Sequence, residues 1–188
     1  MSWVECPAIE LDLESAPAER FAEVPEHALE KARDLLDHVM EEVPPGARFV
    51  ADAVRLRTAN RFHDEARALA ERAGVDWRSV MLANLAYDFV LASFGCSTLA
   101  LPTPSGPVLA RNMDFWPEAV LARSSYLVRN VRAGALAFAN AGWPGAIGVV
   151  TGMSGRGFAV ALNAVASEEG PCRTGYPVLL HLRRVVED

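Results

Sequence analysis

Three cysteines in 188 residues are too few for a disulfide scaffold, and Cys6, Cys96 and Cys172 show no CxxC or cysteine–histidine spacing. The four histidines form no HExxH pair, so the sequence offers no metal ligand set. Runs of lysine and arginine are also missing, and the formal net charge is −6. Such a chain is poorly suited to neutralise a phosphate backbone. We therefore expect no metal, no cofactor and no nucleic-acid partner.

The N-terminus lacks the basic segment and apolar run of a secretory signal, and carries Glu5, Glu10 and Asp12 instead. The longest apolar stretch, residues 80–94, has 15 residues and includes Asn84. A membrane-spanning helix needs about 20 consecutive apolar residues. We therefore expect a buried helix there, no stable membrane span and a cytoplasmic location.

The first half of the chain has the pattern of amphipathic helices, and its composition of 51% hydrophobic and 22% charged residues allows a sizeable core. Residues 24–43 place apolar side chains at three- and four-residue intervals, which predicts a helix. A second helix is predicted over residues 48–73, with Gly74 as its C-cap. Asp76 is a suitable N-cap for a third helix that reaches about Val90.

After residue 94 the pattern changes to short apolar and β-branched runs separated by Gly, Pro and Ser, which is typical of strands joined by hairpins. A final helix over residues 176–188 would cover one face of the sheet. The expected fold is α+β, with an N-terminal helical segment (1–95) followed by a mostly antiparallel sheet (96–188). The expected strands are residues 96–101, 107–113, 126–132, 135–140, 147–151 and 158–163.

Reactive side chains gather where the helices give way to strands. Cys96 begins one strand, and Arg111 and Asp114 end the next strand across a Pro/Gly hairpin, so pairing would bring the three together. A nearby cation stabilises a thiolate, and Asn163 at the end of the last strand would supply a neutral oxyanion donor. Positions 111 and 114 face opposite sides of a regular strand, so this strand must bend or end near Asn112.

Each of these residues also has a structural explanation. A cysteine in an apolar strand is often an inert core residue, as Cys96 would then be. The sequence Arg-Asn-Met-Asp at a strand end often forms a turn with a surface ion pair. Asn163 would cap the backbone. The residues taken singly leave both interpretations open.

Taken in order, the motifs resemble the acid ceramidase and N-acylethanolamine acid amidase family of N-terminal-nucleophile cysteine hydrolases, which is related to choloylglycine hydrolase and penicillin V acylase. Cys-Ser-Thr at 96–98 is similar to the Cys-Thr-Ser of the family, and Ala-Arg-Asn-Met-Asp-Phe at 110–115 to its GRNMDF strand end. Residues 145–152 are similar to its GYVGxxTG run, and residues 9–21 to its opening strand with the LDLPPxxRW pattern. The resemblance implies an αββα fold, of which this chain would hold a part.

The resemblance also implies an activity. The bond between Gly95 and Cys96 would break autocatalytically, and the new N-terminal Cys96 would attack the non-peptide carbon–nitrogen bond of an N-acyl amide. The pair Leu162-Asn163 is similar to the bile-salt hydrolase branch, in which an asparagine at this place helps to bind the oxyanion. The substrate therefore stays open among fatty-acyl amides, ceramides, bile-salt conjugates and acyl homoserine lactones.

An apolar acyl chain is expected because large apolar side chains lie near the proposed site in the sequence and would line a hydrophobic slot, although such residues also build ordinary cores. Two other functions remain: an acyltransferase of the same family, and a non-catalytic remnant that acts by association. A papain-like protease is disfavoured because the histidines are placed differently. The slot residues are Phe94, Phe115, Trp116, Trp143 and Met153.

The families continue beyond the helix at 176–188, and their later active-site asparagine and arginine have no counterpart here. A six-stranded sheet with one covering helix would leave an apolar face in water, which is rare for a monomer. The N-terminal helices, a second copy in a homo-oligomer, or residues lost beyond Asp188 would cover that face. We expect loss or dimerisation, with hydrolysis by this chain alone weak or absent.

Overall fold

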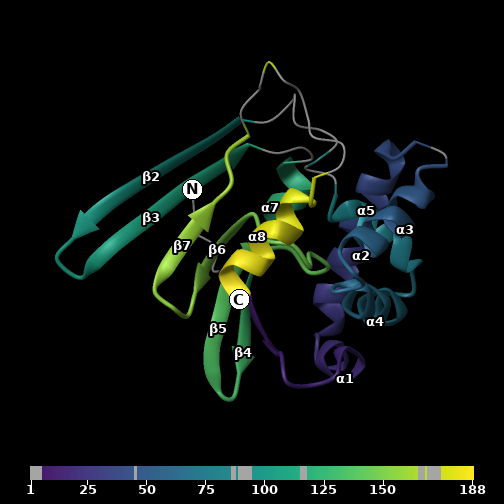
Figure 1. Cartoon of the computed structure of the whole chain (residues 1–188), viewed down its shortest axis with the longest axis horizontal. Coiled ribbons are helices and arrows are strands. Elements are labelled where there is room, and N and C mark those ends of the chain that lie inside the picture. The colour runs from purple at the N-terminus through teal and green to yellow at the C-terminus, as the bar shows by residue number, and fades with distance from the viewer. Residues whose placement is uncertain are drawn as a thin grey trace.

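The computed structural model describes residues 6–44, 46–85, 88, 95–114, 118–164, 168 and 175–188. Helices α1 to α5 gather on one side of the molecule, and the hairpin β2–β3 extends away from its body (Figure 1). The helices are α1 (Pro17–Ala22), α2 (Glu26–Glu42), α3 (Arg48–Arg57), α4 (His63–Ala73), α5 (Trp77–Ala83), α7 (Glu118–Ser124) and α8 (Val178–Glu187). The strands are β1 (Ala8–Asp12), β2 (Gly95–Thr103), β3 (Gly106–Asp114), β4 (Tyr126–Arg132), β5 (Ala135–Gly142), β6 (Thr151–Ser154) and β7 (Phe158–Ala161).

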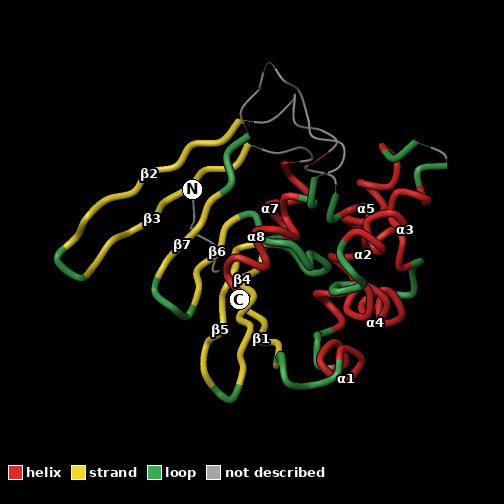
Figure 2. The backbone as a smooth tube through the Cα atoms, in the orientation of Figure 1, coloured by secondary structure: helices red, strands yellow, loops and turns green. Residues whose placement is uncertain are grey.

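The strands form two sheets, and the α+β class is confirmed. One sheet has the order β1-β4-β5-β6-β7, and the other contains only β2 and β3 (Figure 2). β1 runs parallel to β4, and the other described pairs are antiparallel. The single six-stranded meander that the sequence suggested is therefore wrong. β1 occupies the edge beside β4, and α7 separates β4 from β3, so the hairpin β2–β3 stands apart.

The local signals for the helices are largely confirmed. Gly74 caps α4 in the left-handed conformation with φ of 71°, and the side chain of Asp76 accepts a hydrogen bond from the N–H of Arg78. The helix predicted over 48–73 is nevertheless two helices. Between them Ala59 and Asn60 have φ values of 50° and 61°, which a right-handed helix does not contain. The short helices α1 and α7 were not expected from the sequence.

The strand predicted over residues 147–151 is displaced, because β6 begins only at Thr151. The backbone N–H groups of Ile147 and Gly148 both donate to Oδ1 of Asn84, at 2.8 Å each. The N–H of Val149 donates to the carbonyl of Leu179 in α8. These backbone groups bond to a side chain and a helix, so they do not take part in a strand ladder.

The helices cover one face of the five-stranded sheet. Tyr126 and Val128 pack with the N-terminal helices, while Phe138 packs with Val186 of α8. The register places Val128 and Phe138 on the same face, because Asn130 lies opposite Phe138 and shares a face with Val128.

The other face of this sheet stays open among the described residues. Leu127 and Met153, which alternate onto it, are 39% and 49% exposed. The helices described in the N-terminal segment pack on the covered face, so the possibility that they fold across the second face is wrong for the described parts of the chain. In the same parts, none of the helices combines the length and apolar character that crossing a bilayer requires.

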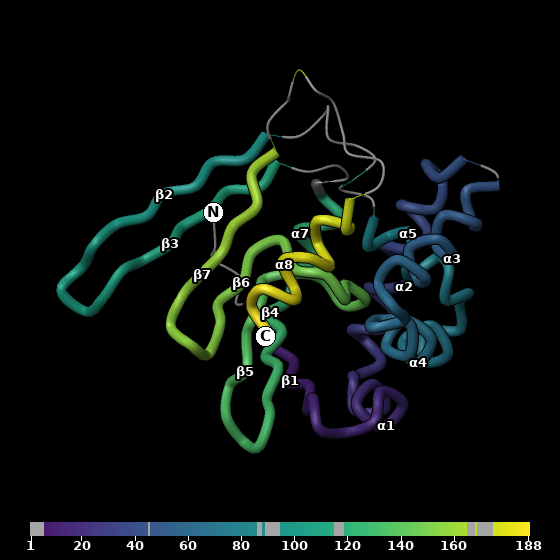
Figure 3. The backbone as a smooth tube through the Cα atoms, in the orientation of Figure 1, coloured from purple at the N-terminus to yellow at the C-terminus, as the bar shows by residue number. Residues whose placement is uncertain are grey.

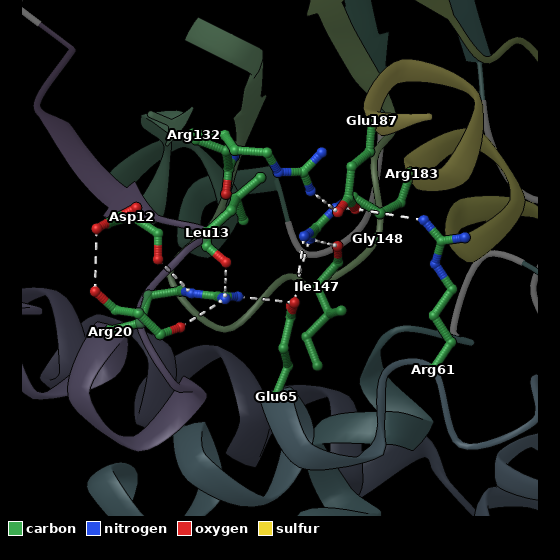
Figure 4. Close-up of polar contacts among 12 residues, drawn as sticks. Asp12, Leu13, Arg20, Arg61, Glu65, Arg132, Ile147, Gly148, Arg183 and Glu187 are labelled. Atoms are coloured by element: carbon green, nitrogen blue, oxygen red, sulfur yellow. Dashed lines mark hydrogen bonds and ion pairs between the residues drawn. The ribbon is translucent and has the colours of Figure 1, made fainter. Parts of the chain in front are cut away.

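A network of charged side chains joins the two segments of the chain (Figure 4). Oε1 of Glu65 in α4 lies 2.9 Å from Nη1 of Arg20 in α1 and 3.3 Å from Nη2 of Arg183 in α8. Both arginines are buried. Arg183 also donates to the carbonyl of Ile147 and pairs with Glu187. The network thus connects α1 and α4 to α8 and to the segment that precedes β6.

We predict that Glu65→Gln lowers the free energy of unfolding by about 3–5 kcal/mol, because it leaves two buried guanidinium groups without their shared carboxylate. Chemical denaturation measures this change. Glu71→Gln, at an exposed position of the same helix, is the matched control and should change stability little. Equal effects of the two substitutions would contradict a central role for Glu65.

A second prediction concerns pH. Oδ1 of Asp88 accepts a hydrogen bond from the N–H of Val178 at the start of α8. Burial raises the pKa of Asp88 above its usual 3.8, and the bond from Val178 partly offsets this. The folded protein therefore holds this proton more tightly than the unfolded chain, so stability falls as pH rises from 3.8 through the raised pKa.

Asp88→Asn keeps an oxygen acceptor for Val178 and removes the buried charge, so it should abolish this contribution and stabilise the protein at neutral pH. Denaturation curves between about pH 4 and 7 measure the slope. Asp37→Asn, at an exposed position of α2, should leave the slope unchanged. An identical slope for wild type and Asp88→Asn would refute the prediction.

Candidate functional site

The register of the hairpin β2–β3 decides which side chains meet. Cys96 pairs with Met113, and Thr98 pairs with Arg111. Residues directly opposite in an antiparallel pair share a face, and residues two apart in a strand do so as well. These four side chains therefore lie on one face of the hairpin. Cys96 is partly exposed, so its thiol can contact a neighbouring side chain and still be accessible to a molecule from solution.

Arg111 connects this face to the five-stranded sheet. Its Nη2 donates to Sγ of Cys96 at 3.2 Å and to the carbonyl of Leu162 at 2.6 Å. Its Nη1 donates to Oγ1 of Thr151 at 2.8 Å and lies 3.1 Å from Sδ of Met113. The guanidinium is thus held from β3, β6 and the end of β7. A guanidinium held in this way is suited to stabilise negative charge on the sulfur.

Asn163 lies next to this arrangement. Its Oδ1 accepts a hydrogen bond of 2.9 Å from Oγ1 of Thr98, two residues after Cys96. The bond holds the amide by its oxygen and turns its N–H₂ group away from Thr98. The side chain is exposed, so this donor end is accessible to a bound molecule. Its described partner is a side chain, not the backbone group that a capping role would use.

Asp114 lies on the opposite face from Arg111. β3 continues in register to Asp114, so the expectation that the strand bends or ends near Asn112 is wrong. The Oδ1 of Asp114 accepts a hydrogen bond of 2.8 Å from Asn112. Its Oδ2 lies 3.2 Å from the point where a side chain at Gly95 would begin. The carboxylate therefore stands beside Gly95 and not on the thiol's face, because regular strand alternation is kept.

The residues expected to line a hydrophobic slot do not form one group. Phe94, Phe115 and Trp116 lie outside the described residues. Trp143 packs among the helices with Leu35 and Leu121 and lines an apolar pocket there. Met153 alternates with Thr151 onto the open face of the sheet and is not part of that pocket. The structure therefore does not bring Trp143 and Met153 together in that pocket.

Sequence reasoning missed three contacts of the site: Thr98, Thr151 and the carbonyl of Leu162. Thr98 was detectable, because a residue two positions after a strand cysteine shares its face. Thr151 was not, since the strand that contains it was placed four residues too early. A carbonyl acceptor depends on tertiary structure and has no signal in the side-chain pattern.

The geometry decides against two structural explanations for the described residues. The contacts of Arg111 are a thiol, a thioether, a hydroxyl and a carbonyl, so it is not half of a surface ion pair. Cys96 touches a guanidinium and is not surrounded by apolar atoms alone.

Within the described residues, no three His, Cys, Asp or Glu side chains come together as a metal site would require. No family model matches this chain, and a comparison with curated proteins finds no match.

We predict that Arg111→Ala slows alkylation of Cys96 by iodoacetamide about tenfold or more, because the thiolate loses a charge-assisted hydrogen bond. The measurement uses a background in which Cys6 and Cys172 are serine. Arg129→Ala, an exposed arginine of β4, is the control and should leave the rate unchanged. The alkylation rate of Arg111→Lys should lie between those of the wild type and Arg111→Ala, because lysine keeps the positive charge but cannot make the forked contacts of the guanidinium.

Thermal unfolding of the same variants separates chemistry from structure. Arg111→Ala should change the alkylation rate much more than the unfolding temperature. Strong unfolding with a normal rate in the folded fraction would show that Arg111 acts only as a structural link. Asp114→Ala should leave alkylation unchanged, because this carboxylate lies on the other face of the hairpin.

Proposed function

We propose that this chain is an N-terminal-nucleophile cysteine amidase, similar to acid ceramidase, that hydrolyses the carbon–nitrogen bond of an N-acyl amide. The contact between Nη2 of Arg111 and Sγ of Cys96, at 3.2 Å, carries the proposal. A fixed guanidinium beside a half-buried thiol at the start of a strand is the arrangement that a thiolate nucleophile needs. In this proposal the helical layer on one face of the five-stranded sheet would form half of an αββα sandwich.

The first step of this proposal is maturation. Sγ of Cys96 attacks the carbonyl carbon of Gly95, the bond from that carbon to the nitrogen of Cys96 breaks, and the thiol proton passes to this nitrogen. Water then adds hydroxide to the thioester carbon and a proton to the sulfur, which releases the carboxylate of Gly95. The cross-strand pairing of Gly95 with Asp114 supports this step, because it places a carboxylate beside the scissile bond.

Maturation gives Cys96 its own base. A free α-amine has a pKa of about 7.7–8.0 and an ordinary thiol about 8.5, so the two are matched for proton transfer near neutral pH. The amine accepts the thiol proton, Sγ attacks the acyl carbon, and the N–H₂ group of Asn163 donates to the oxyanion. The carbon–nitrogen bond breaks as the leaving amine takes the proton from the α-ammonium. Water hydrolyses the thioester and restores the thiol.

Two residues position these groups in the proposal. Arg111 stabilises the thiolate, and its bonds to Leu162 and Thr151 hold it at the sulfur. Asp114 would accept a hydrogen bond from the new α-amine and orient it, since it already lies beside Gly95. The acyl-enzyme would yield a new amide instead of an acid if an amine replaced water, which is the acyltransferase reaction.

A second function, association without catalysis, has a separate observation in its favour. Leu99, Leu101 and Val108 on the hairpin are 55%, 48% and 48% exposed, and they alternate onto the face opposite Cys96. Together with the open face of the five-stranded sheet, they give the chain apolar surface of the kind that marks interaction sites. A homo-oligomer would bury such surface. Light scattering tests it, and a monomer would count against it.

We predict that the purified protein converts to fragments of 95 and 93 residues from its 188, and that Cys96→Ala stays whole. Intact-mass spectrometry after incubation at acidic and neutral pH measures the conversion. Cys6→Ser is the control and should cut normally. A wild-type protein that remains one 20.3 kDa species under all these conditions would contradict self-cleavage.

Turnover is a second readout of the same proposal. A fluorogenic fatty-acyl amide should be hydrolysed by the cut protein and not by Cys96→Ala. Asp114→Ala should slow both the cut and the turnover, although it leaves the thiol accessible. Cutting without turnover would retain the maturation step and remove the amidase assignment.

A further inference from the structure

The amide of Asn163 lies beyond the end of a strand and needs a contact to fix its orientation. β7 ends at Ala161, and the side chain of Asn163 is exposed. The last torsion of an asparagine side chain is broad, and the amide has donors at one end and an acceptor at the other. An exposed asparagine can therefore turn either end toward a neighbouring group unless a partner selects one.

Thr98 of β2 makes the contact that selects an orientation. Its Oγ1 donates to Oδ1 of Asn163 at 2.9 Å. With the amide oxygen bound in this way, the N–H₂ group is the end that can donate to a molecule at the site. In the reverse orientation the amide oxygen would face an oxyanion, and the two negative charges would repel. Threonine is stiff at χ1, so the position of its hydroxyl is well defined.

Thr98 and its cross-strand partner hold two consecutive residues. Thr98 pairs with Arg111, whose Nη2 donates to the carbonyl of Leu162, while Thr98 binds the side chain of Asn163. The N–H of Leu162 in turn donates to the carbonyl of Val150. Figure 3 shows the chain that follows β7 beside the end of the hairpin where β2 begins and β3 ends. The amide is thus placed relative to the same guanidinium that contacts the sulfur.

The position of Thr98 also sets the spacing between the amide and the sulfur. Cys96 and Thr98 lie on one face of β2, two residues apart. An antiparallel strand rises about 3.4 Å per residue, so their Cα atoms are about 6.8 Å apart. An acyl carbon bonded to Sγ, with its oxygen turned along the strand, is suited to a gap of this size. The hydroxyl of Thr98 holds the amide at the far side of that gap.

We infer that Thr98 is a positioning residue, which orients the amide of Asn163 so that its N–H₂ group faces the oxygen of a carbonyl under attack by Cys96. The inference rests on the proposed function for the role of Cys96 as the nucleophile. The hydroxyl of Thr98 itself touches none of the reacting atoms. Its loss should therefore slow the steps that pass through an oxyanion and leave other reactions of the thiol unchanged.

Two reactions of the same thiol separate these cases. With p-nitrophenyl acetate, Sγ of Cys96 bonds to the carbonyl carbon, the bond from that carbon to the phenolic oxygen breaks, p-nitrophenolate leaves, and the thiol proton passes to solvent. The carbonyl oxygen is negatively charged in the tetrahedral intermediate. Iodoacetamide alkylates the same sulfur with loss of iodide and forms no oxyanion. The ester also needs no proton on its leaving group, so acylation is independent of amide hydrolysis.

Both rates are measured in the full chain with Cys6 and Cys172 replaced by serine. Thr98→Val keeps the shape and strand preference of threonine and removes the hydroxyl. It should lower the acylation rate about tenfold or more and leave the alkylation rate unchanged. Thr98→Ser keeps the hydroxyl and should retain most of the acylation rate. Ser97→Ala is the matched control, because it removes a neighbouring hydroxyl on the opposite face of the hairpin, and should leave both rates unchanged.

A double-mutant cycle tests whether Thr98 acts through Asn163. Asn163→Ala should slow acylation at least as much as Thr98→Val does. Combining the two substitutions should cause no further loss, because the group that Thr98 orients is already gone. Additive losses would overturn the inference, since Thr98 would then act on the ester by another route.

The outcomes also separate this inference from the proposed function. The same ratio of acylation to alkylation in wild type and Thr98→Val would overturn the positioning role, even in a protein that hydrolyses amides. The expected loss in a protein without amide turnover would retain the positioning role and remove the amidase assignment. A wild-type protein in which the ester does not react with Cys96 would overturn both.

Discussion

The carboxylate of Glu65 lies between two buried guanidinium groups, and the relative position of the two segments of the chain depends on it. Charged groups leave water at a cost of several kcal/mol each, so the pairing is tolerable only with further hydrogen bonds. Those bonds exist: Arg20 donates to three carbonyls of residues 12–15, and Arg183 donates to the carbonyl of Ile147. The network therefore fixes the turn after β1 as well as the segment before β6.

The geometry at Cys96 follows from this anchoring. The carbonyl of Leu179 in α8 holds the N–H of Val149, and the carbonyl of Val150 holds the N–H of Leu162. The carbonyl of Leu162 then accepts from Arg111, which reaches the sulfur. A displacement of α8 would pass along these bonds to the guanidinium. The hairpin itself is mostly exposed, so its position relative to the sheet depends on contacts of this kind.

The sequence allowed good predictions where the cause of a structure is local. The periodic helix over 24–43, the cap at Gly74 and the cap at Asp76 depend on neighbours within a few residues, and the structure contains all three. The meeting of Cys96 and Arg111 followed from a hairpin with a short turn. The bend that was expected to bring Asp114 to them was wrong, because regular strand alternation is kept.

The predictions that failed concern features that depend on long-range contacts. Asn84 is more than sixty residues from Ile147 and Gly148 in the sequence. Its side chain binds their N–H groups, so these groups do not form the strand expected over residues 147–151. Trp143 and Met153 are near each other in sequence, yet one packs against helices and the other lies on the open face of the sheet. The family resemblance stays a prediction, because it rests on short motifs. The spacing of these motifs agrees with the geometry of the site, but the same geometry does not require membership of the family.

A cut between Gly95 and Cys96 would leave most of the contacts between the segments in place. β1 belongs to the first segment and is paired with β4 of the second, and the main core joins side chains of both. Glu65 would continue to bind Arg183 across the cut. The bond proposed to break lies at one end of the exposed hairpin, whereas the contacts that join the segments lie in the sheet, between β1 and β4, and on its covered face. Maturation would then free an α-amine at the site without requiring the core to reorganise.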